Sequence, residues 1–294
     1  MSSMTRRTAL TVLTSSTLAI SQALPAAENR GANNVLTMLV MDPLAKELSC
    51  PCVKGYAQRE YNDLGKHLAV KLKRPVTVVF SETLVGALKT NKLPDGVDLI
   101  IGKRSVVEFD SRAAELAVTP LAALSGKDGV TTQQGLIVVP AKDPAKKVAD
   151  LKGYQIYFGP EDCDEKHKAA LALLKENGVP IPAKLETCSA CSDGATKILE
   201  LGADVRAATV ISSYAAPLLE GCGTIQKGDL RVVGKTAPVP FITAFATSRL
   251  AEKDQAAIRE ILLELIESRK LCEALETQLG FVELATVSDA TKKK

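Results

Sequence analysis

The chain has 294 residues, which exceeds the usual size of one compact core and suits two domains of roughly 100 to 150 residues each. With 46% hydrophobic and 24% charged residues, the composition is that of a globular protein and excludes a largely disordered or fibrous chain. The 37 basic and 34 acidic residues nearly balance, and the longest basic run is the Lys292 to Lys294 tail, which argues against a nucleic-acid partner.

The first 27 residues have the pattern of an export signal. Arg6 and Arg7 precede a modestly apolar run over 9–20, and small residues suited to cleavage follow at 23–27. The adjacent arginines resemble a twin-arginine (Tat) signal; Ala9 stands where that signal usually has a large apolar residue, so ordinary Sec export is the alternative. No segment reaches the roughly 20 apolar residues of a membrane helix. We therefore expect a soluble periplasmic or extracytoplasmic protein without membrane insertion.

From residue 34 onward, apolar β-branched runs alternate with amphipathic stretches. "NVLTMLVM" predicts a buried strand, and the helix expected over 56–72 places its apolar residues on one face. The alternation continues with strands at 75–80, 96–102, 135–140, 154–159, 183–188 and 207–211, and with helices at 85–90, 106–116, 164–177, 193–201, from 212, 252–269 and 270–279. Ser81 and Ser105 are expected to cap the helices that follow them. This alternation predicts an α/β protein with parallel-type sheets covered by helices.

Three segments carry a resemblance to a known family: "VADLKGYQIYFG", "SSYAAPLLE" and "LRVVGKTAPVPF". They resemble the phosphonate- and phosphate-type solute-binding proteins of ABC importers, which are type 2 periplasmic binding proteins, and the likeness runs from about residue 34 to 284. It implies two lobes with two hinge crossings near residues 125 and 238: lobe 1 from 30–125 plus 238–285, and lobe 2 from 126–237. Residues 286–294 are expected to form a disordered tail.

The resemblance also implies a function. We expect an exported, monomeric, non-catalytic protein that closes two lobes on a small solute, such as an oxyanion of the phosphate or phosphonate type, and presents it to an ABC permease. No resident cofactor is expected. The sequence itself offers no Gly-rich phosphate loop, no G-x-S-x-G elbow and no H-E-x-x-H motif, and Cys163 with His167 is the sole candidate catalytic dyad.

Candidate ligand-binding residues lie in the loops that follow strands. In open α/β sheets, ligands bind beyond the carboxyl ends of the strands, where helix N-termini present free N–H groups. Hydroxyl groups that can cap a helix or bind an oxyanion are those of Ser81, Thr83, Ser105, Ser192, Ser212 and Ser213. Lys103 and Arg104 either contact an anion or form a solvated pair. Tyr56 begins the helix after the loop that corresponds to the family's first-lobe ligand loop.

The family's ligand residues carry over only in part. Where the family has a Ser-Thr-Ser type run around the phosphonate oxygens, this chain has 161–165, which includes Asp162, Cys163 and Asp164. Its Ser-His pair is matched by Ser192 and Asp193, and its amine-binding acid by Ser212 or Ser213. Carboxylates at 161–165 would repel a phosphonate unless they point away or a cation intervenes.

The seven cysteines leave two hypotheses open. Five lie in the strand-to-helix loops, and Cys163 and His167 have the i, i+4 spacing that places two ligands on one helical face. One hypothesis is a metal-handling or thiol-redox accessory protein with a soft metal such as copper or zinc, or an iron centre; its ligands would be Cys50, Cys52, Cys163, His167, Cys188 and Cys191. The other is that Cys188 and Cys191 form a local disulfide, that Cys50 and Cys52 pair with other cysteines or stay reduced, and that buried thiols are core filler.

Overall fold

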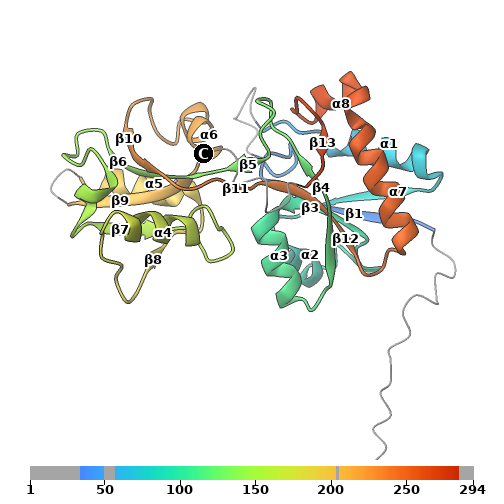
Figure 1. The fold of residues 1–294 in the computed structure, drawn as a ribbon, viewed down its shortest axis with the longest axis horizontal. Helices are drawn as coiled ribbons and strands as arrows, with labels where there is room; N and C mark the ends of the chain where they lie inside the picture. Colours follow the sequence, from blue (N-terminus) through green and yellow to red (C-terminus); the bar gives the residue numbers. More distant parts are fainter. Residues whose placement is uncertain (1–33, 50–56, 203–204, 285–294) are drawn as a thin grey trace, which may run out of the picture.

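The computed structural model describes residues 34–49, 57–202 and 205–284. Two α/β lobes lie side by side along the long axis of the molecule, and two extended segments connect them (Figure 1). The expected export signal, the C-terminal tail, Cys50, Cys52 and Tyr56 lie outside the described residues. Within the described part, no helix is both long and apolar enough to cross a membrane.

Lobe 1 is built on a sheet of six strands. In spatial order they are β13 (Phe281–Val282), β4 (Val118–Leu124), β12 (Ile242–Thr247), β3 (Leu99–Lys103), β1 (Leu36–Met41) and β2 (Val76–Phe80). Its helical elements are α1 (Tyr61–Leu72), α2 (Leu84–Lys89), α3 (Arg104–Ala113), α7 (Glu252–Leu263), η2 (Glu264–Glu267) and α8 (Arg269–Ala274).

Strand β1 is apolar at every position except Thr37 because helices cover both faces of the sheet. Met38 and Val40 pack in one core with residues of α1 and α7, whereas Leu39 and Met41 pack in a second core with residues of α2 and α3. Since side chains of a strand alternate between faces, burial on both sides removes the polar alternation of a half-exposed strand. The expected buried strand is confirmed.

Lobe 2 is built on a sheet of five strands. In spatial order they are β10 (Leu230–Lys235), β6 (Gly135–Pro140), β9 (Ala207–Ser212), β7 (Gln155–Phe158) and β8 (Glu186–Thr187). Its helical elements are η1 (Val148–Leu151), α4 (Lys168–Glu176), α5 (Cys191–Glu200) and α6 (Ala215–Gly221). One core packs η1 and α4 on the sheet, and a second core packs α5 and α6 on its other face.

The two connections between the lobes run side by side. Strand β5 (Thr132–Gln133) leads from lobe 1 into lobe 2, and β11 (Val239–Pro240) leads back. They pair antiparallel, with Val239 opposite Gln133 and Pro240 opposite Thr132. A two-residue ribbon of this kind supplies the short crossing at which the lobes can rotate.

Both sheets are mixed, so the expectation of parallel-type sheets is wrong in part. β1 runs parallel to β2 and β3, but β12 runs antiparallel to β3 and β4. In lobe 2, β6 runs antiparallel to β9 and β10. The cause is the double crossing: β4 and β6 carry the chain toward lobe 2, and β10 and β12 carry it back in the opposite direction.

Candidate functional site

A cleft of about 640 Å³ lies between the lobes, at the carboxyl ends of their strands. Lobe 1 contributes the ends of β1 and β3 and the start of α2, while lobe 2 contributes the loop after β7 and the starts of α5 and α6. We call this cavity the interlobe cleft. Much of its wall is apolar; the larger apolar side chains are Met41, Pro43, Leu48, Val106, Leu218 and Leu219.

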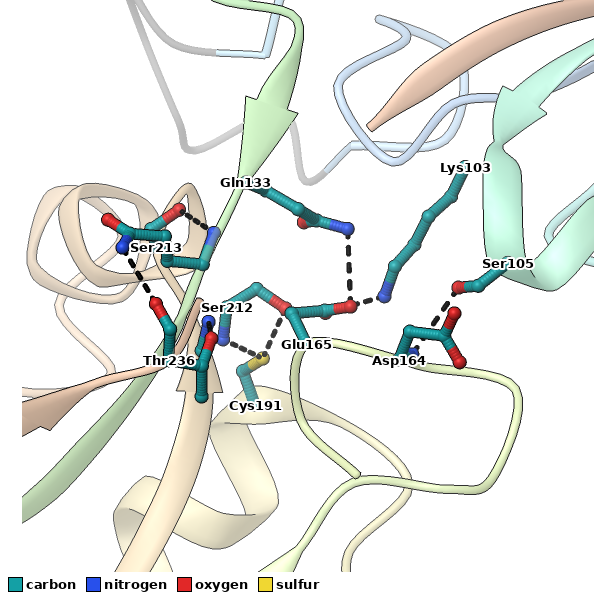
Figure 2. Close-up of polar contacts among 11 residues, drawn as sticks. Lys103, Ser105, Gln133, Asp164, Glu165, Cys191, Ser212, Ser213 and Thr236 are labelled. Atoms are coloured by element: carbon teal, nitrogen blue, oxygen red, sulfur yellow. Dashed lines mark hydrogen bonds and ion pairs between the residues drawn. The ribbon is translucent and has the colours of Figure 1, made fainter. Parts of the chain in front are cut away.

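One buried carboxylate joins the two lobes at this cleft. Glu165 of lobe 2 is fully buried, and its Oε1 lies 2.6 Å from Nζ of Lys103 at the end of β3. Ser212 Oγ donates to the same oxygen at 2.6 Å, and Gln133 Nε2 of β5 donates to Oε2 at 3.2 Å. Figure 2 shows these side chains converging on Glu165 from lobe 1, lobe 2 and the hinge strand. The carboxylate is therefore held by all three parts of the molecule.

Lys103 keeps its charge in this setting. Its side chain is 5% exposed, and burial by itself would favour the neutral amine. The attraction of Glu165 outweighs this effect and raises the pKa of Lys103 well above its usual value. Lys103 and Glu165 thus form an ion pair in which both side chains are shielded from water.

A second contact between the lobes lies beside the ion pair. The backbone N–H of Asp164 donates to Oγ of Ser105, the second residue of α3, at 3.4 Å (Figure 2).

The loop that carries Glu165 also packs tightly on its own lobe. A Cβ atom on Gly135, at the start of β6, would lie 2.0 Å from the backbone oxygen of Glu165. Glycine at 135 is what allows the loop to approach the sheet so closely.

Lys166 supplies a further ammonium group to the cleft. It lines the cavity, and among the described residues no carboxylate lies within ion-pair distance of it. Its stem lies on Gly159, where an added Cβ would come within 2.5 Å of the Lys166 Cβ. The sequence pattern indicated Glu165 only as part of the acidic run at 161–165, and it indicated neither Lys166 nor Gln133. The contact between Lys166 and Gly159 forms only in the folded turn, so no local sequence pattern indicated Lys166.

The expected hydroxyl residues have different places. Thr83 lines the cleft and caps α2, because its Oγ1 accepts from the N–H of Gly86 at 2.9 Å. Ser192 also lines the cleft. Ser212 binds Glu165, as described, and Ser213 accepts from the N–H of Gln134 at 3.2 Å.

Ser81 and Ser105 do not cap the helices that follow them, so these two expectations are wrong. Ser81 Oγ donates to the carbonyl of Thr83, and α3 begins one residue before Ser105. In both cases the helix begins at a different residue from the one that the hydroxyl suggested, because tertiary contacts fix where each loop ends.

Three charged candidates bind neighbours on their own lobe. Arg104 Nε lies 2.8 Å from Glu108, one turn along α3, and Asp164 Oδ1 lies 3.0 Å from Lys168 on α4. Asp193 accepts from the N–H of Ala190 at the start of α5. None of the three lines the cleft. Asp162 does line it, and its Oδ1 is buried without a hydrogen-bond partner in the described part of the chain.

The thiols do not assemble a metal site in the described part of the chain. Cys163, Cys191 and Cys222 line the cleft, and all five described cysteines are free, so Cys188 and Cys191 form no disulfide with each other. No group of three or more His, Cys, Asp or Glu side chains among the described residues is arranged to hold a metal ion.

Cys163 and His167 do not share a helical face, which contradicts the expectation from their spacing. α4 begins only at Lys168, and the preceding residues form a turn. His167 Nδ1 lies 2.9 Å from the carbonyl of Gly159. Burial raises the pKa of the Cys163 thiol to about 11, so it stays protonated at neutral pH. A protonated thiol is a poor nucleophile and a poor metal ligand.

A second cavity of about 500 Å³ shares Ala57, Tyr214 and Leu218 with the interlobe cleft. Tyr214 borders both spaces and stacks on Phe241 with ring centroids 5.1 Å apart. Burial raises the pKa of Tyr214 well above its usual value. The stack of a lobe 2 residue on the segment after β11 adds an apolar contact across the hinge.

Comparison with known proteins identifies a family. Residues 55–291 match the family model described as "ABC transporter, phosphonate, periplasmic substrate-binding protein". No curated protein matches the sequence.

Solved structures share the fold. XAC2383 from Xanthomonas citri, bound to ATP, aligns with a TM-score of 0.63 at 14% identity, covering 87% of this chain and 93% of that one. A binding protein component of an ABC phosphonate transporter from Pseudomonas aeruginosa aligns with a TM-score of 0.60 at 13% identity, covering 85% and 81%. PhnD1 from Prochlorococcus marinus, in complex with methylphosphonate, aligns with a TM-score of 0.59 at 13% identity, covering 86% and 93%. The expected two-lobed type 2 periplasmic binding protein fold is confirmed.

Proposed function

Because the chain belongs to the family of periplasmic substrate-binding proteins of phosphonate ABC transporters, we propose that it binds a small acidic solute of the phosphonate type between its lobes and delivers it to an ABC importer. The closed, solute-bound form would be the one presented to the permease, and the protein would act as a monomer. Rotation at β5 and β11 would open and close the interlobe cleft. No catalytic role is proposed, since the family consists of transporter binding proteins.

The observation that carries the proposal is the Lys166 ammonium on the wall of the interlobe cleft. Among the described residues it has no carboxylate partner within ion-pair distance, and Lys166 is only 5% exposed. A buried charge is costly unless it is paired, so an anionic solute would remove that cost. The hydroxyl groups of Thr83 and Ser192 line the same cleft and can donate to solute oxygens.

A thermal-shift screen tests the proposal. The full chain without residues 1–27 would be heated with phosphate, phosphite, methylphosphonate and methanesulfonate. A solute present at 100 times its Kd should stabilise the folded state by about 2.7 kcal/mol. Lys166→Met should weaken binding of the active compound by about tenfold or more. Lys175→Met, an exposed lysine on α4, is the matched control and should not change it.

Two outcomes would contradict the proposal. One is the absence of a shift with every compound of the panel; the other is equal affinity in Lys166→Met and the unsubstituted protein.

For the export step, we propose that residues 1–27 direct the chain out of the cytoplasm and are then removed. Mass spectrometry of the protein from a periplasmic extract would show whether the mature chain begins near residue 28.

A further inference from the structure

Two ammonium groups face the interlobe cleft from the described residues, but only one is available to a solute. Lys103 and Lys166 both line the cavity. Lys103 already has a carboxylate at 2.6 Å, and that carboxylate also accepts from Ser212 and Gln133. An anion that took the place of Glu165 would have to displace a group held by three contacts and anchored in the same chain. Lys103 is therefore neutralised from within the protein.

Among the described residues, the other charged groups that line the cleft are acidic. Asp162 and Glu82 line the cavity, and Oδ1 of Asp162 is buried with no hydrogen-bond partner that the structure describes. A solute with two negative charges would meet one unneutralised ammonium, that of Lys166, together with the Asp162 carboxylate. The second negative charge would have no cationic partner among the described residues and would be repelled by Asp162. A solute with one negative charge has no second charge that would be left unpaired.

The size and the apolar walls of the cleft indicate a solute that has an apolar part in addition to its acid group. About 640 Å³ is well within the range of pockets for whole small molecules. Met41 and Val106 of lobe 1 face this space, as do Leu218 and Leu219 of lobe 2. Apolar walls of this extent stabilise a solute that buries apolar surface against them.

We propose that Glu165 is a built-in counter-anion for Lys103, and that it thereby restricts the cleft to acidic solutes that carry one negative charge and an apolar body. Glu165 would be the residue that determines the charge selectivity of this protein. The inference rests on the proposed function, because it specifies the class of solute bound at the same site.

Butanesulfonate and butylphosphonate form a matched pair of probes, measured by isothermal titration calorimetry at alkaline pH. Both carry the same alkyl chain, but under these conditions the sulfonate has one charge and the phosphonate has two. The unsubstituted protein should bind butanesulfonate at least about tenfold more tightly than butylphosphonate. This comparison needs no variant, so it does not depend on whether a substituted chain folds.

Glu165→Gln tests the cause of the selectivity. Glutamine keeps the size of the side chain and can still accept from Ser212, but it frees the charge of Lys103. Butylphosphonate affinity should rise by about tenfold or more, whereas butanesulfonate affinity should change less. In Lys103→Met with Glu165→Gln, the gain should disappear. Glu176→Gln, which removes one exposed carboxylate at the end of α4, controls for net charge and should reproduce neither effect.

The outcomes separate this inference from the proposed function. If neither probe binds to the unsubstituted protein and no compound of the thermal-shift panel does, the proposed function fails, and the inference with it. If butylphosphonate binds the unsubstituted protein as tightly as butanesulfonate does, or if Glu165→Gln leaves the ratio of the two affinities unchanged, the inference is wrong while the proposed function stands.

Discussion

Replacing Lys103 by Met should destabilise the protein far more than a surface substitution does. The change removes the cation of the buried pair and leaves the Glu165 carboxylate, which is 0% exposed, with Ser212 and Gln133 as its donors. Removing one partner of a buried ion pair costs about 3–5 kcal/mol, because the remaining charge stays in a medium of low polarity. Two donors still satisfy the carboxylate here. We therefore expect a loss of about 3 kcal/mol, at the lower end of the range.

The neighbouring residue provides the matched control. Arg104 is also a cation with a carboxylate partner at 2.8 Å, but both side chains of that pair are about one third exposed. Arg104→Met should cost only about 0.5 kcal/mol, since water screens an exposed pair. In Lys103→Met with Glu165→Gln neither member of the pair remains as an unpaired buried charge, and the loss should shrink to about 1 kcal/mol.

Urea unfolding followed by circular dichroism would measure these differences, and small-angle X-ray scattering would follow the separation of the lobes. Because the pair joins lobe 1 to lobe 2, Lys103→Met should also increase the radius of gyration without solute. The reasoning would be refuted if Lys103→Met cost less than about 1 kcal/mol, or if the double substitution cost as much as the single one.

Three further predictions concern the same region. Ser212→Ala removes the 2.6 Å donor to Glu165 and should lower the free energy of unfolding by about 1–3 kcal/mol in urea, whereas a loss near zero would show that the bond contributes nothing. Gly135→Ala places a Cβ atom 2.0 Å from a backbone oxygen and should lower the melting temperature, with a loss of about 1–3 kcal/mol; an unchanged melting temperature would contradict the packing described for this loop. Alkylation of Cys163 by iodoacetamide should stay slow until the pH approaches the thiol pKa of about 11, and rapid alkylation at neutral pH would contradict its burial. Because folding raises this pKa, the stability that the neutral thiol contributes is fully present below its ordinary pKa of 9.0 and is lost as the pH rises toward about 11.

The fold was largely predictable from the sequence, and parts of the site were not. Buried strands such as β1 leave a largely apolar run in the sequence. The strand itself then places the residue at its end, and Lys103, the last residue of β3, lies at the carboxyl end of that strand. The acidic run at 161–165 forms a turn, in which no helical or strand period fixes the direction of each side chain.

Glu165 shows the limit most clearly. Its cation lies in the other lobe, 62 positions away in the sequence, and nothing in the local pattern distinguishes it from Glu161, which is exposed. The cap of α2 had the same difficulty on a smaller scale, because Ser81 and Thr83 are both good capping residues and only tertiary packing decides between them. Tertiary packing determines which side chain pairs with which and which residue caps a helix. The local sequence determines where strands and loops lie.

The double crossing also sets an order in which the chain can acquire its structure. Lobe 2 is one uninterrupted stretch from β6 to β10, so all of its strands are present once residue 235 has been synthesised. The sheet of lobe 1 lacks β12, the strand between β3 and β4, until residue 247 follows. A nascent chain that stops after β10 therefore holds a complete second lobe beside a first lobe whose sheet is divided in two, and the last fifth of the chain closes that gap.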